Sequence, residues 1–361
     1  MNIRLAEILR PKNINEVIGQ EHLTGENAPI RKMIENDTLN SLIFWGPPGT
    51  GKTTLSEIIA EKSNRKFFKL SAVSSGVKEV REVIDEAKKQ NLFSGKSPIL
   101  FIDEIHRFSK SQQDSLLQAV EKGWIVLIGA TTENPSFEVV SALLSRSQVY
   151  VLKALSYEKL CQVIDNALQK YNDINQKSFI INEKDVFIQY SGGDARKLIN
   201  SVELVLNQYK NTNKNWNING KKTQISIHKY ITMASILEKE STKTDENKLI
   251  ASVFLNRLAK GMKLQTDPSA NYAADKLTGA PTQKELTEDS PYNTYTTVGL
   301  PPGPIASTST ISFEALNNAE KTDYLYFLHA TKDGKGYFSK TYAEHEELAK
   351  KHIEGYIPSG S

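Results

Sequence analysis

Eight consecutive residues, Gly46 to Thr53, carry the clearest chemistry in this chain. They read GPPGTGKT and fit the pattern G-x-x-x-x-G-K-[ST]. Glycines at this spacing let backbone N–H groups wrap phosphate oxygens, while Lys52 would reach the outer phosphates and Thr53 would hold Mg²⁺. The residues predicted to bind a nucleotide here are Gly46, Pro47, Pro48, Gly49, Thr50, Gly51, Lys52, Thr53 and Thr54.

The flanking sequence provides the context that this pattern requires. The apolar run 41–45 (SLIFW) comes directly before the loop, and a helical pattern over 53–62 follows it. A helix N-terminus at this point adds a dipole that favours anions. The alternative is a Gly/Pro turn that matches by chance, and the strand and helix on either side disfavour it.

A pair of carboxylates follows a second apolar run. Residues 99–104 read ILFIDE, which predicts a buried strand that ends at Asp103 and Glu104. Asp103 would lie beside the Mg²⁺ water shell, and Glu104 would polarise the water that attacks the phosphate. An Asp-Glu pair alone is weak evidence, but after a buried strand and a phosphate loop it is strong.

The elements that must position these residues alternate along the first part of the chain. Short apolar runs at 41–45, 99–102 and 125–128 are typical of buried parallel strands, and helical patterns occupy 53–62, 77–89 and 112–121. This alternation predicts a three-layer α/β domain, with a parallel sheet, over residues 1–152. Residues 153–210 are mainly helical, with Ser156 as a predicted N-cap, and form a helical lid.

Residues 1–210 resemble the AAA+ ATPases, and within them the clamp-loader-like family of replication-associated recombination protein A. The matching runs are FWGPPGTGKTT, FIDEIHRFSKSQQDSLL, GATTENPSFEVVSALLSR and GGDARKLIN. The resemblance implies ATP with Mg²⁺, DNA as a partner in replication and repair, and assembly into a homo-oligomer. After residue 210 we see no counterpart of the family's oligomer-forming sequence, which puts tetramer formation in doubt.

The same resemblance assigns further site residues. Val17 and Ile18 would contact adenine, and Thr132 would be the sensor at a strand end. Arg146 would be an arginine finger acting on a neighbouring subunit, and Arg196 the lid sensor. As alternatives, Arg146 is an ordinary cation at a helix C-terminus and Arg196 a solvated lid charge.

Residues 228–356 resemble a different family, the catalytic part of the MltG/YceG-like endolytic murein transglycosylases. The matching runs include ASILEKE (234–240), IASVFLNRLAKGMKLQTDPSANY (250–272) and YNTYTTVGLPPGPIA (292–306). The implied fold is a separate α+β domain over 228–357, after a linker at 211–227 that is rich in Asn and Lys. The implied activity cleaves peptidoglycan glycan strands and leaves 1,6-anhydro ends.

Glu238 is the predicted general acid of this second region. A single glutamate can protonate the leaving oxygen and then take a proton from the sugar's own 6-hydroxyl. Glu238 shares a helix face with Ile231 and Ala234, where partial burial would raise its pKa. Glu240 would point about 200° away on the same helix and would not share the cleft. The alternative for Glu238 is a solvated surface glutamate.

Four more polar residues are candidates for binding the glycan. Gln265 and Asp267 lie in LQTDP, and Asn293 and Tyr295 lie in YNTY. They would line a sugar groove, or they would only make hydrogen bonds within turns, as Asn and Asp often do near Pro and Gly.

Composition limits the remaining classes of function. The chain has 361 residues with Lys+Arg 45, Asp+Glu 42 and a net charge of +3, so bulk charge supports neither a nucleic-acid nor a membrane function. The single cysteine, Cys161, excludes an internal disulfide framework. There is no apolar run of membrane-spanning length and no secretory leader, so we expect a cytoplasmic chain. A natural fusion, a chimera and a chain with one inactive half all remain open.

Overall fold

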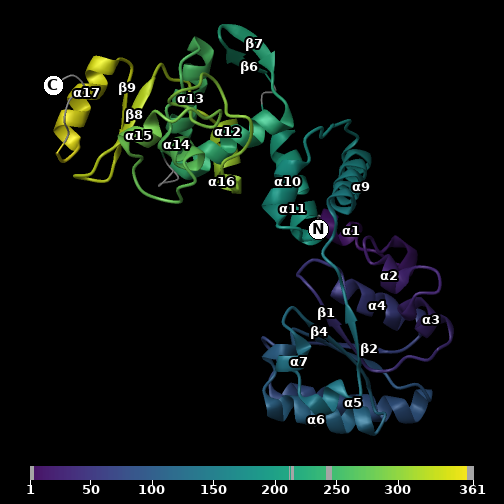
Figure 1. The fold of residues 1–361 in the computed structure, drawn as a ribbon. Helices are drawn as coiled ribbons and strands as arrows, with labels where there is room; N and C mark the ends of the chain where they lie inside the picture. Colours follow the sequence, from purple (N-terminus) through teal and green to yellow (C-terminus); the bar gives the residue numbers. More distant parts are fainter. Residues whose placement is uncertain (1–3, 211, 213–214, 241–245, 356–361) are drawn as a thin grey trace. The chain divides into compact units, whose positions relative to one another are not determined.

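The computed structural model describes residues 4–210, 212, 215–240 and 246–355. The chain divides into two compact units (Figure 1). Unit 1 comprises Met1–Ser178 and Phe187–Ser201, and unit 2 comprises Phe179–Val186 and Val202–Ser361. Each unit is described by itself below.

Unit 1 is built on a five-stranded parallel sheet with the order β2-β3-β4-β1-β5. The strands are β1 (Leu42–Trp45), β2 (Phe67–Ser71), β3 (Ile99–Asp103), β4 (Val126–Thr131) and β5 (Gln148–Val151). The predicted strands at 41–45, 99–102 and 125–128 correspond to the three central ones, β1, β3 and β4. The prediction of a parallel α/β sheet is therefore confirmed, and the outer strands β2 and β5 were missed.

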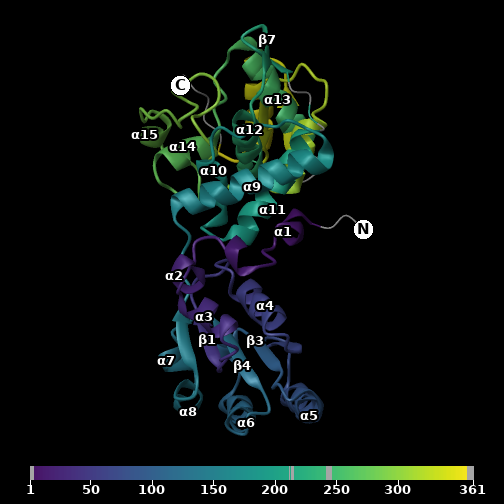
Figure 2. The ribbon, with the colours of Figure 1, turned by 90° about the vertical axis from the view of Figure 1, so that its right-hand side faces the viewer.

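Helices cover both faces of this sheet because neighbouring strand residues point to opposite sides. Leu42 and Phe44 pack with residues of α3 (Pro29–Glu35) and α4 (Lys52–Lys62). Ile43 packs instead with residues of α5 (Val77–Ser94) and α6 (Lys110–Glu121). Figures 1 and 2 show these two pairs of helices on opposite sides of the sheet. The three predicted layers are thus present.

The remaining helices of this part of the chain are short, apart from those that follow the sheet. They are α1 (Leu5–Ile8), η1 (Ile14–Glu16), α2 (Glu21–Thr24), η2 (Ile105–Arg107), α7 (Pro135–Glu138), α8 (Ser141–Leu144), α9 (Tyr157–Asn175), α10 (Asp185–Ser191) and α11 (Ala195–Tyr209). Ser156 accepts a hydrogen bond from the Lys159 N–H and so caps α9, as predicted. Residues of α10 and α11 belong partly to unit 1 and partly to unit 2.

Unit 2 combines helices with two small antiparallel sheets. Its elements are β6 (Asn215–Ile218), β7 (Lys221–Gln224), α12 (Ile227–Glu240), α13 (Asn247–Lys260), α14 (Asp267–Ala273), α15 (Gln283–Leu286), α16 (Thr310–Asn317), β8 (Tyr326–His329), β9 (Gly336–Ser339) and α17 (Tyr342–His352). Tyr230, Phe254 and Phe313 are fully buried and come from α12, α13 and α16. These three helices therefore supply the core, and the predicted α+β character is observed.

The segment predicted as a linker, 211–227, contains a β-hairpin. β6 pairs with β7, and Asn219 and Gly220 both have positive φ at the turn between them. An Asn-Gly pair favours this tight hairpin turn, and Trp216 is buried. The abundance of Asn and Lys concealed a short alternating pattern, so the segment predicted as a linker contains regular structure that its composition did not indicate.

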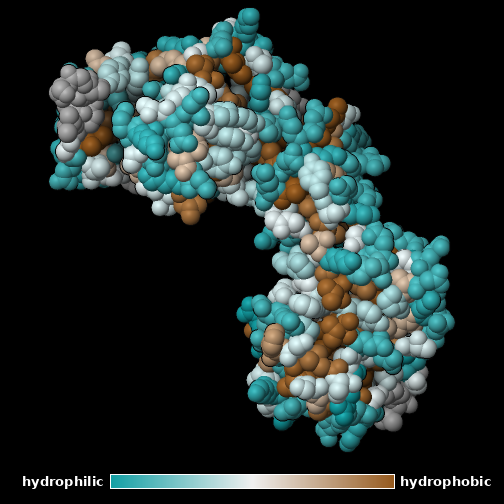
Figure 3. All heavy atoms as spheres, in the orientation of Figure 1, coloured by the Kyte–Doolittle hydropathy of each residue, from teal (hydrophilic) through white to brown (hydrophobic). Residues whose placement is uncertain are grey.

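Figure 3 and the helix lengths bear on whether the described residues could cross a membrane. Figure 3 shows hydrophilic residues over much of both units on the face drawn, with apolar residues in smaller patches between them. Among the described residues, no helix combines the length and the apolar character needed to cross a membrane.

Candidate functional site

The predicted phosphate loop lies between β1 and α4 in unit 1. Gly49 and Gly51 have φ of 73° and 97°, a left-handed conformation that glycine adopts without strain. A Cβ atom on Gly49 would lie 2.3 Å from the Asp194 carboxylate, and one on Gly46 would lie 2.3 Å from the Leu152 carbonyl oxygen. Packing therefore requires glycine at positions 46 and 49, and the backbone conformation favours it at positions 49 and 51.

Lys52 is buried at the centre of this loop. Its Nζ donates hydrogen bonds to the carbonyl oxygens of Gly46 at 2.7 Å and Pro47 at 2.8 Å. Burial lowers the pKa of Lys52, and the carboxylates of Glu104, Asp103 and Asp194 act in the opposite direction. A buried ammonium group whose hydrogen bonds within the described residues go to main-chain oxygens is well placed to bind an incoming phosphate.

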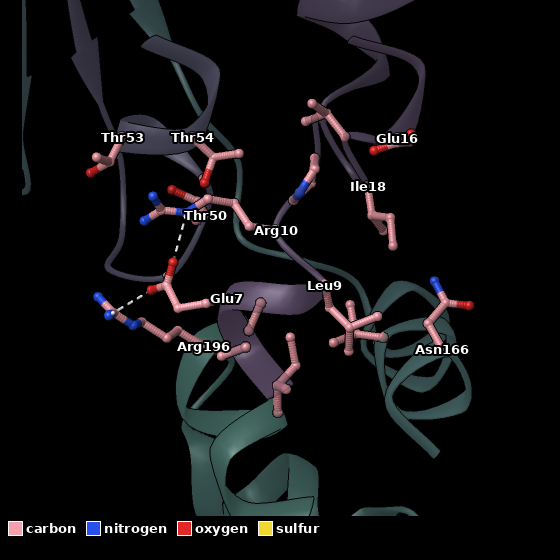
Figure 4. A pocket seen from close by; sticks show the side chains of 18 of the residues that line it. Glu7, Leu9, Arg10, Glu16, Ile18, Thr50, Thr53, Thr54, Asn166 and Arg196 are labelled. Carbon is pink, nitrogen blue, oxygen red and sulfur yellow. Dashed lines mark hydrogen bonds and ion pairs between the residues drawn. The ribbon is translucent and has the colours of Figure 1, made fainter. Parts of the chain in front are cut away.

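A cavity of about 920 Å³ opens beside the loop. It brings together twelve of the predicted residues: Val17, Ile18, Pro48, Gly49, Thr50, Gly51, Lys52, Thr53, Thr54, Asp103, Glu104 and Arg196. Figure 4 shows Thr53 and Thr54 on one part of its wall, and Leu9, Ile18 and Asn166 on another. One part of the wall is thus polar, and another has the apolar side chains that suit a nucleobase.

Glu104 lies at the end of β3 with a left-handed backbone, at φ 56° and ψ 46°. A non-glycine residue in this region is strained, and such strain concentrates at functional sites. The Thr132 hydroxyl donates to the Glu104 carboxylate at 3.4 Å. Thr132 therefore acts on the cavity through Glu104, since it does not itself line the cavity wall.

Two predicted arginines have ion-pair partners in different places. Arg196 pairs with Glu7 at 3.2 Å, and Glu7 also lies 3.8 Å from Arg10 (Figure 4). Arg146 pairs with Glu121 at 2.7 Å and is not among the residues that line the 920 Å³ cavity. The role of Arg146 as a finger for a neighbouring subunit stays a prediction.

Sequence reasoning missed Glu7, Arg10 and Asp194 at this cavity. Asp194 Oδ1 accepts from the N–H groups of Arg196 and Lys197 at 2.8 and 3.0 Å, as an N-cap does. The run GGDAR before a helical pattern signalled that cap. No local signal marks Glu7, because its position depends on how α1 packs.

The donor set suits Mg²⁺ bound together with a nucleotide. Thr53 and Asp103 both line the cavity. Within the described part of the chain, His, Cys, Asp and Glu side chains nowhere form a group of three that could hold a metal ion. Mg²⁺ fits the hydroxyl of Thr53 and the carboxylate of Asp103 if nucleotide oxygens supply further ligands.

In unit 2, Glu238 does not have the character expected of a general acid. Its Oε2 accepts from the Ser309 N–H at 2.9 Å, the Ser309 hydroxyl at 2.8 Å and the Ser312 hydroxyl at 2.5 Å. Partial burial acts to raise the pKa of Glu238, but these hydrogen bonds outweigh it and hold the pKa below its usual value. The prediction of a raised pKa at Glu238 is wrong, because its face of α12 meets the start of α16 and not an apolar surface.

Glu240 has the character that was expected of Glu238. Burial, and then the neighbouring Asp267 carboxylate, raise the pKa of Glu240 to about 8. Its carboxylate accepts a hydrogen bond from the Asp267 N–H, and the Arg257 guanidinium moderates the shift. The two glutamates of α12 do face different neighbours, and Glu240 is the one that retains its proton at neutral pH.

Three of the four predicted glycan-binding residues gather around Glu240. The Tyr295 hydroxyl donates to Asp267 Oδ1 at 2.6 Å, and burial with that carboxylate raises the pKa of Tyr295. Gln265 Oε1 accepts from Arg257 Nη1 at 3.2 Å. Arg257 itself is buried, which lowers its pKa. Side chains of α12, α13 and the two turns thus form one polar cluster.

Asn293 has a different role from its neighbours. Its Nδ2 donates to the carbonyl oxygens of Glu285, Leu286 and Glu288, and its Oδ1 accepts from the Tyr295 N–H. The side chain is fully buried. Asn293 therefore makes hydrogen bonds within the turn that carries Tyr295. This was the alternative interpretation of Asn293, in place of glycan binding.

Comparisons with known proteins match the two parts of the chain separately. The YceG-like family matches residues 78–351, and the Holliday junction DNA helicase RuvB P-loop domain matches residues 9–143. Replication-associated recombination protein A of Haemophilus influenzae is 46% identical over 230 residues, which are 63% of this chain and 50% of that protein. The Escherichia coli protein of the same name is 48% identical over 204 residues, covering 56% of this chain and 45% of that protein. The chain thus spans about half the length of these curated relatives.

Two solved structures are similar to parts of this chain. A YceG-like protein from Listeria monocytogenes is 39% identical with a TM-score of 0.40, and covers 52% of this chain and 64% of its own. The RuvB Holliday junction branch migration motor of Thermotoga maritima is 26% identical with a TM-score of 0.47, and covers 56% of this chain and 66% of its own. Because its family model matches residues 78–351, the chain belongs to the YceG-like family, and its N-terminal part is similar to the RuvB P-loop domain and to replication-associated recombination protein A.

Proposed function

We propose that unit 1 binds ATP with Mg²⁺ and hydrolyses it. The observation that carries this proposal is the position of Lys52, buried in a glycine loop, bonded to two loop carbonyl oxygens and within one cavity with Asp103 and Glu104. The terminal phosphates would replace the Gly46 and Pro47 oxygens as partners of Lys52. Val17 and Ile18 would contact the base at the apolar wall.

The hydrolytic step follows from the positions of the polar groups. Mg²⁺ with ATP neutralises charge on the phosphate oxygens. Glu104 takes a proton from the attacking water, and the Thr132 hydroxyl holds the carboxylate. Arg196 lies on the cavity wall and neutralises charge on the outer phosphate once it leaves Glu7. Arg146 neutralises charge on the outer phosphate of ATP bound to a neighbouring subunit.

The test is ATP turnover by the whole chain and by Lys52→Ala. Loss of a preorganised charge at the phosphates lowers turnover by about 100-fold or more. Lys62→Ala, at the other end of α4, is the control and retains wild-type turnover. Equal phosphate release by the wild type and Lys52→Ala contradicts the proposal.

The names of the relatives lead us to propose that the chain acts on DNA and assembles with copies of itself. The RuvB domain is named for a helicase of Holliday junction DNA, and the curated relatives are named for recombination. We expect branched DNA to stimulate ATP turnover more than a linear duplex of equal length, and ATP to increase the size of the particle in gel filtration. Turnover that branched DNA leaves unchanged removes this part of the proposal.

A second candidate function belongs to unit 2, which we propose cleaves peptidoglycan glycan strands. The supporting observation is the Glu240 carboxyl, whose pKa is raised to about 8 beside Asp267, Arg257 and Tyr295. A carboxylic acid that keeps its proton at neutral pH is what a general acid needs. Glu240 therefore replaces Glu238 as the proposed acid.

The proposed reaction needs no added water. Glu240 gives its proton to the glycosidic oxygen as the bond from that oxygen to C1 breaks. The 6-hydroxyl oxygen of the same sugar then bonds to C1 and its proton passes to Glu240, so the 1,6-anhydro ring forms and the acid is restored. Gln265, Asp267 and Tyr295 would bind the strand beside this centre.

The matched pair Glu240→Gln and Glu238→Gln tests this assignment. Incubation of the intact chain with glycan strands should yield 1,6-anhydro ends, measured by mass spectrometry. Glu240→Gln should lower the rate by about 10²–10⁴-fold, the range for a general acid, and Glu238→Gln by far less. The reverse order would restore Glu238 to the role. Lys52→Ala should leave this reaction unchanged.

A further inference from the structure

His106 stands between Glu104 and the end of β4. It belongs to η2, the turn of 3₁₀-helix that follows the left-handed residue Glu104. Its Nε2 lies 3.3 Å from Oε2 of Glu104, and the two side chains are 11% and 28% exposed. The imidazole therefore lies against the carboxylate that would activate water, but His106 does not line the nucleotide cavity.

Thr131 fixes the other side of the ring. It is fully buried at the last position of β4, and its Oγ1 lies 3.0 Å from Nδ1 of His106. The same oxygen accepts a hydrogen bond from the Glu133 N–H at 3.0 Å. The single Thr131 hydroxyl proton has two acceptors within reach, the Glu133 carbonyl oxygen at 3.2 Å and Nδ1 of His106. When it goes to Nδ1, the proton of the ring sits on Nε2 and faces the carboxylate.

We propose that His106 is a positioning residue that orients Glu104 for proton transfer, with Thr131 setting the ring. Thr132 and His106 both approach Oε2 of Glu104, at 3.4 and 3.3 Å. Oε1, to which no hydrogen bond is donated within the described part of the chain, is left to take the proton from water. This role rests on the proposed ATP hydrolysis in unit 1.

The geometry also explains why Glu104 keeps a strained backbone. Its left-handed conformation turns the chain so that residues 104 and 106 lie on the same side of the strand end. The end of β4 is then linked to the carboxylate in two ways: Thr132, the residue after the strand, contacts it directly, and Thr131 contacts it through His106. A shift at the end of β4 would therefore move Glu104 relative to the phosphate.

The test separates binding from turnover in the intact chain with ATP and Mg²⁺. A misplaced general base costs about 10²-fold in rate, so His106→Ala should lower kcat by about that factor while the Kd for a fluorescent ATP analogue stays within twofold. His106→Gln keeps a nitrogen at the Nε2 position and should recover most of kcat. His106→Asn keeps one only at the Nδ1 position and should not.

Thr131 provides a second pair. Thr131→Val removes the hydroxyl and keeps the shape, and should lower kcat several-fold, whereas Thr131→Ser should match the wild type. Equal kcat in His106→Ala and the wild type overturns the positioning role, as does equal recovery by Gln and Asn, or a loss of affinity as large as the loss of kcat. A wild type that releases no phosphate overturns the proposed ATPase function, and this role with it.

Discussion

Two buried cations, Lys52 in unit 1 and Arg257 in unit 2, make similar hydrogen bonds but have different structural roles. Lys52 and Arg257 are each 7% exposed, and both donate hydrogen bonds to main-chain carbonyl oxygens. The partners of Lys52 lie five and six residues before it in its own loop. Arg257 bonds to Lys263, Leu264 and Leu325, and its guanidinium lies 5.1 Å from the centre of the Tyr326 ring.

The difference shows how each site is assembled. The loop around Lys52 does not depend on the cation to join distant elements, and Lys52 can exchange its carbonyl partners for phosphate oxygens. Arg257 joins α13 to the turn before α14 and to the start of β8, so it holds the fold and the electrostatic surroundings of Glu240 together. We infer that the site in unit 1 is completed by its ligand and that the site in unit 2 is preorganised.

The largest expected effect is on stability and comes from removing Arg257. Arg257→Met leaves the buried carbonyl oxygen of Leu264 and the partly buried one of Leu325 without this donor, which should lower the free energy of unfolding of unit 2 by about 3 kcal/mol. Lys52→Met removes a buried charge whose pKa is already lowered by burial, so it should change the stability of unit 1 by less than about 1 kcal/mol.

Tryptophan fluorescence can follow the units separately during urea unfolding. Trp216 reports on unit 2 in a Trp45→Phe, Trp124→Phe background, and Trp45 and Trp124 report on unit 1 when Trp216 is replaced by Phe. Arg81→Met, at an exposed position of α5, is the control. If Lys52→Met destabilised unit 1 as much as Arg257→Met destabilises unit 2, the contrast between the two cations would disappear.

A smaller effect should follow from Glu238→Ala. The change leaves the Ser309 N–H and two serine hydroxyls at the start of α16 without their acceptor, at a cost of about 2 kcal/mol to unit 2. The pKa of Glu238 is lower in the folded chain than its ordinary value of 4.5. The part of the stabilisation of unit 2 that comes from the carboxylate charge is therefore fully present above pH 4.5 and is lost as the pH falls through the folded pKa.

Urea unfolding of the wild type, Glu238→Ala and Glu238→Gln at pH 7 and pH 3 measures this dependence. The wild type should be more stable than Glu238→Gln at pH 7 and approach it at pH 3, and Lys229→Ala is the exposed control on the same helix. A gap between the wild type and Glu238→Gln that does not change with pH would mean that the carboxylate charge has no part in the stability.

The same glutamates show what could be predicted from sequence. The phosphate loop, Asp103 and Glu104 follow from contiguous patterns, since a strand, a loop and a helix position them locally. Glu238 and Glu240 are identical in type and two positions apart, and the choice between them depends on Asp267 and Ser309, which reach α12 only through the tertiary fold. The parallel sheet was predictable for the same reason as the loop, whereas β2 and β5 lack the continuous apolar runs of the central strands.

The pH dependence of glycan cleavage should distinguish the unit 2 site further. Activity that requires protonated Glu240 should fall as the pH rises through about 8. Asp267→Asn removes the like charge that helps to raise this pKa, so the fall should move to lower pH by about one unit. Asp289→Asn, at an exposed position, should leave the profile unchanged. A profile that Asp267→Asn does not shift would mean that burial alone sets the pKa of Glu240.

The smallest expected effect is at the ion pair between Glu7 and Arg196, where the unit 1 site is most open to solvent. The two side chains are 42% and 68% exposed, so their pairing contributes little energy. Glu7→Gln frees Arg196 and removes a negative charge from the cavity wall, and ATP should bind about two- to fivefold more tightly, the range of a surface ion pair. Glu16→Gln removes the same charge from the same cavity wall but has no contact with Arg196 among the described residues, so it should give a smaller gain in titrations with a fluorescent ATP analogue. If Glu7→Gln still tightened binding in an Arg196→Gln background, the gain would come from charge alone, and Arg196 would not be the group that exchanges its carboxylate partner for phosphate.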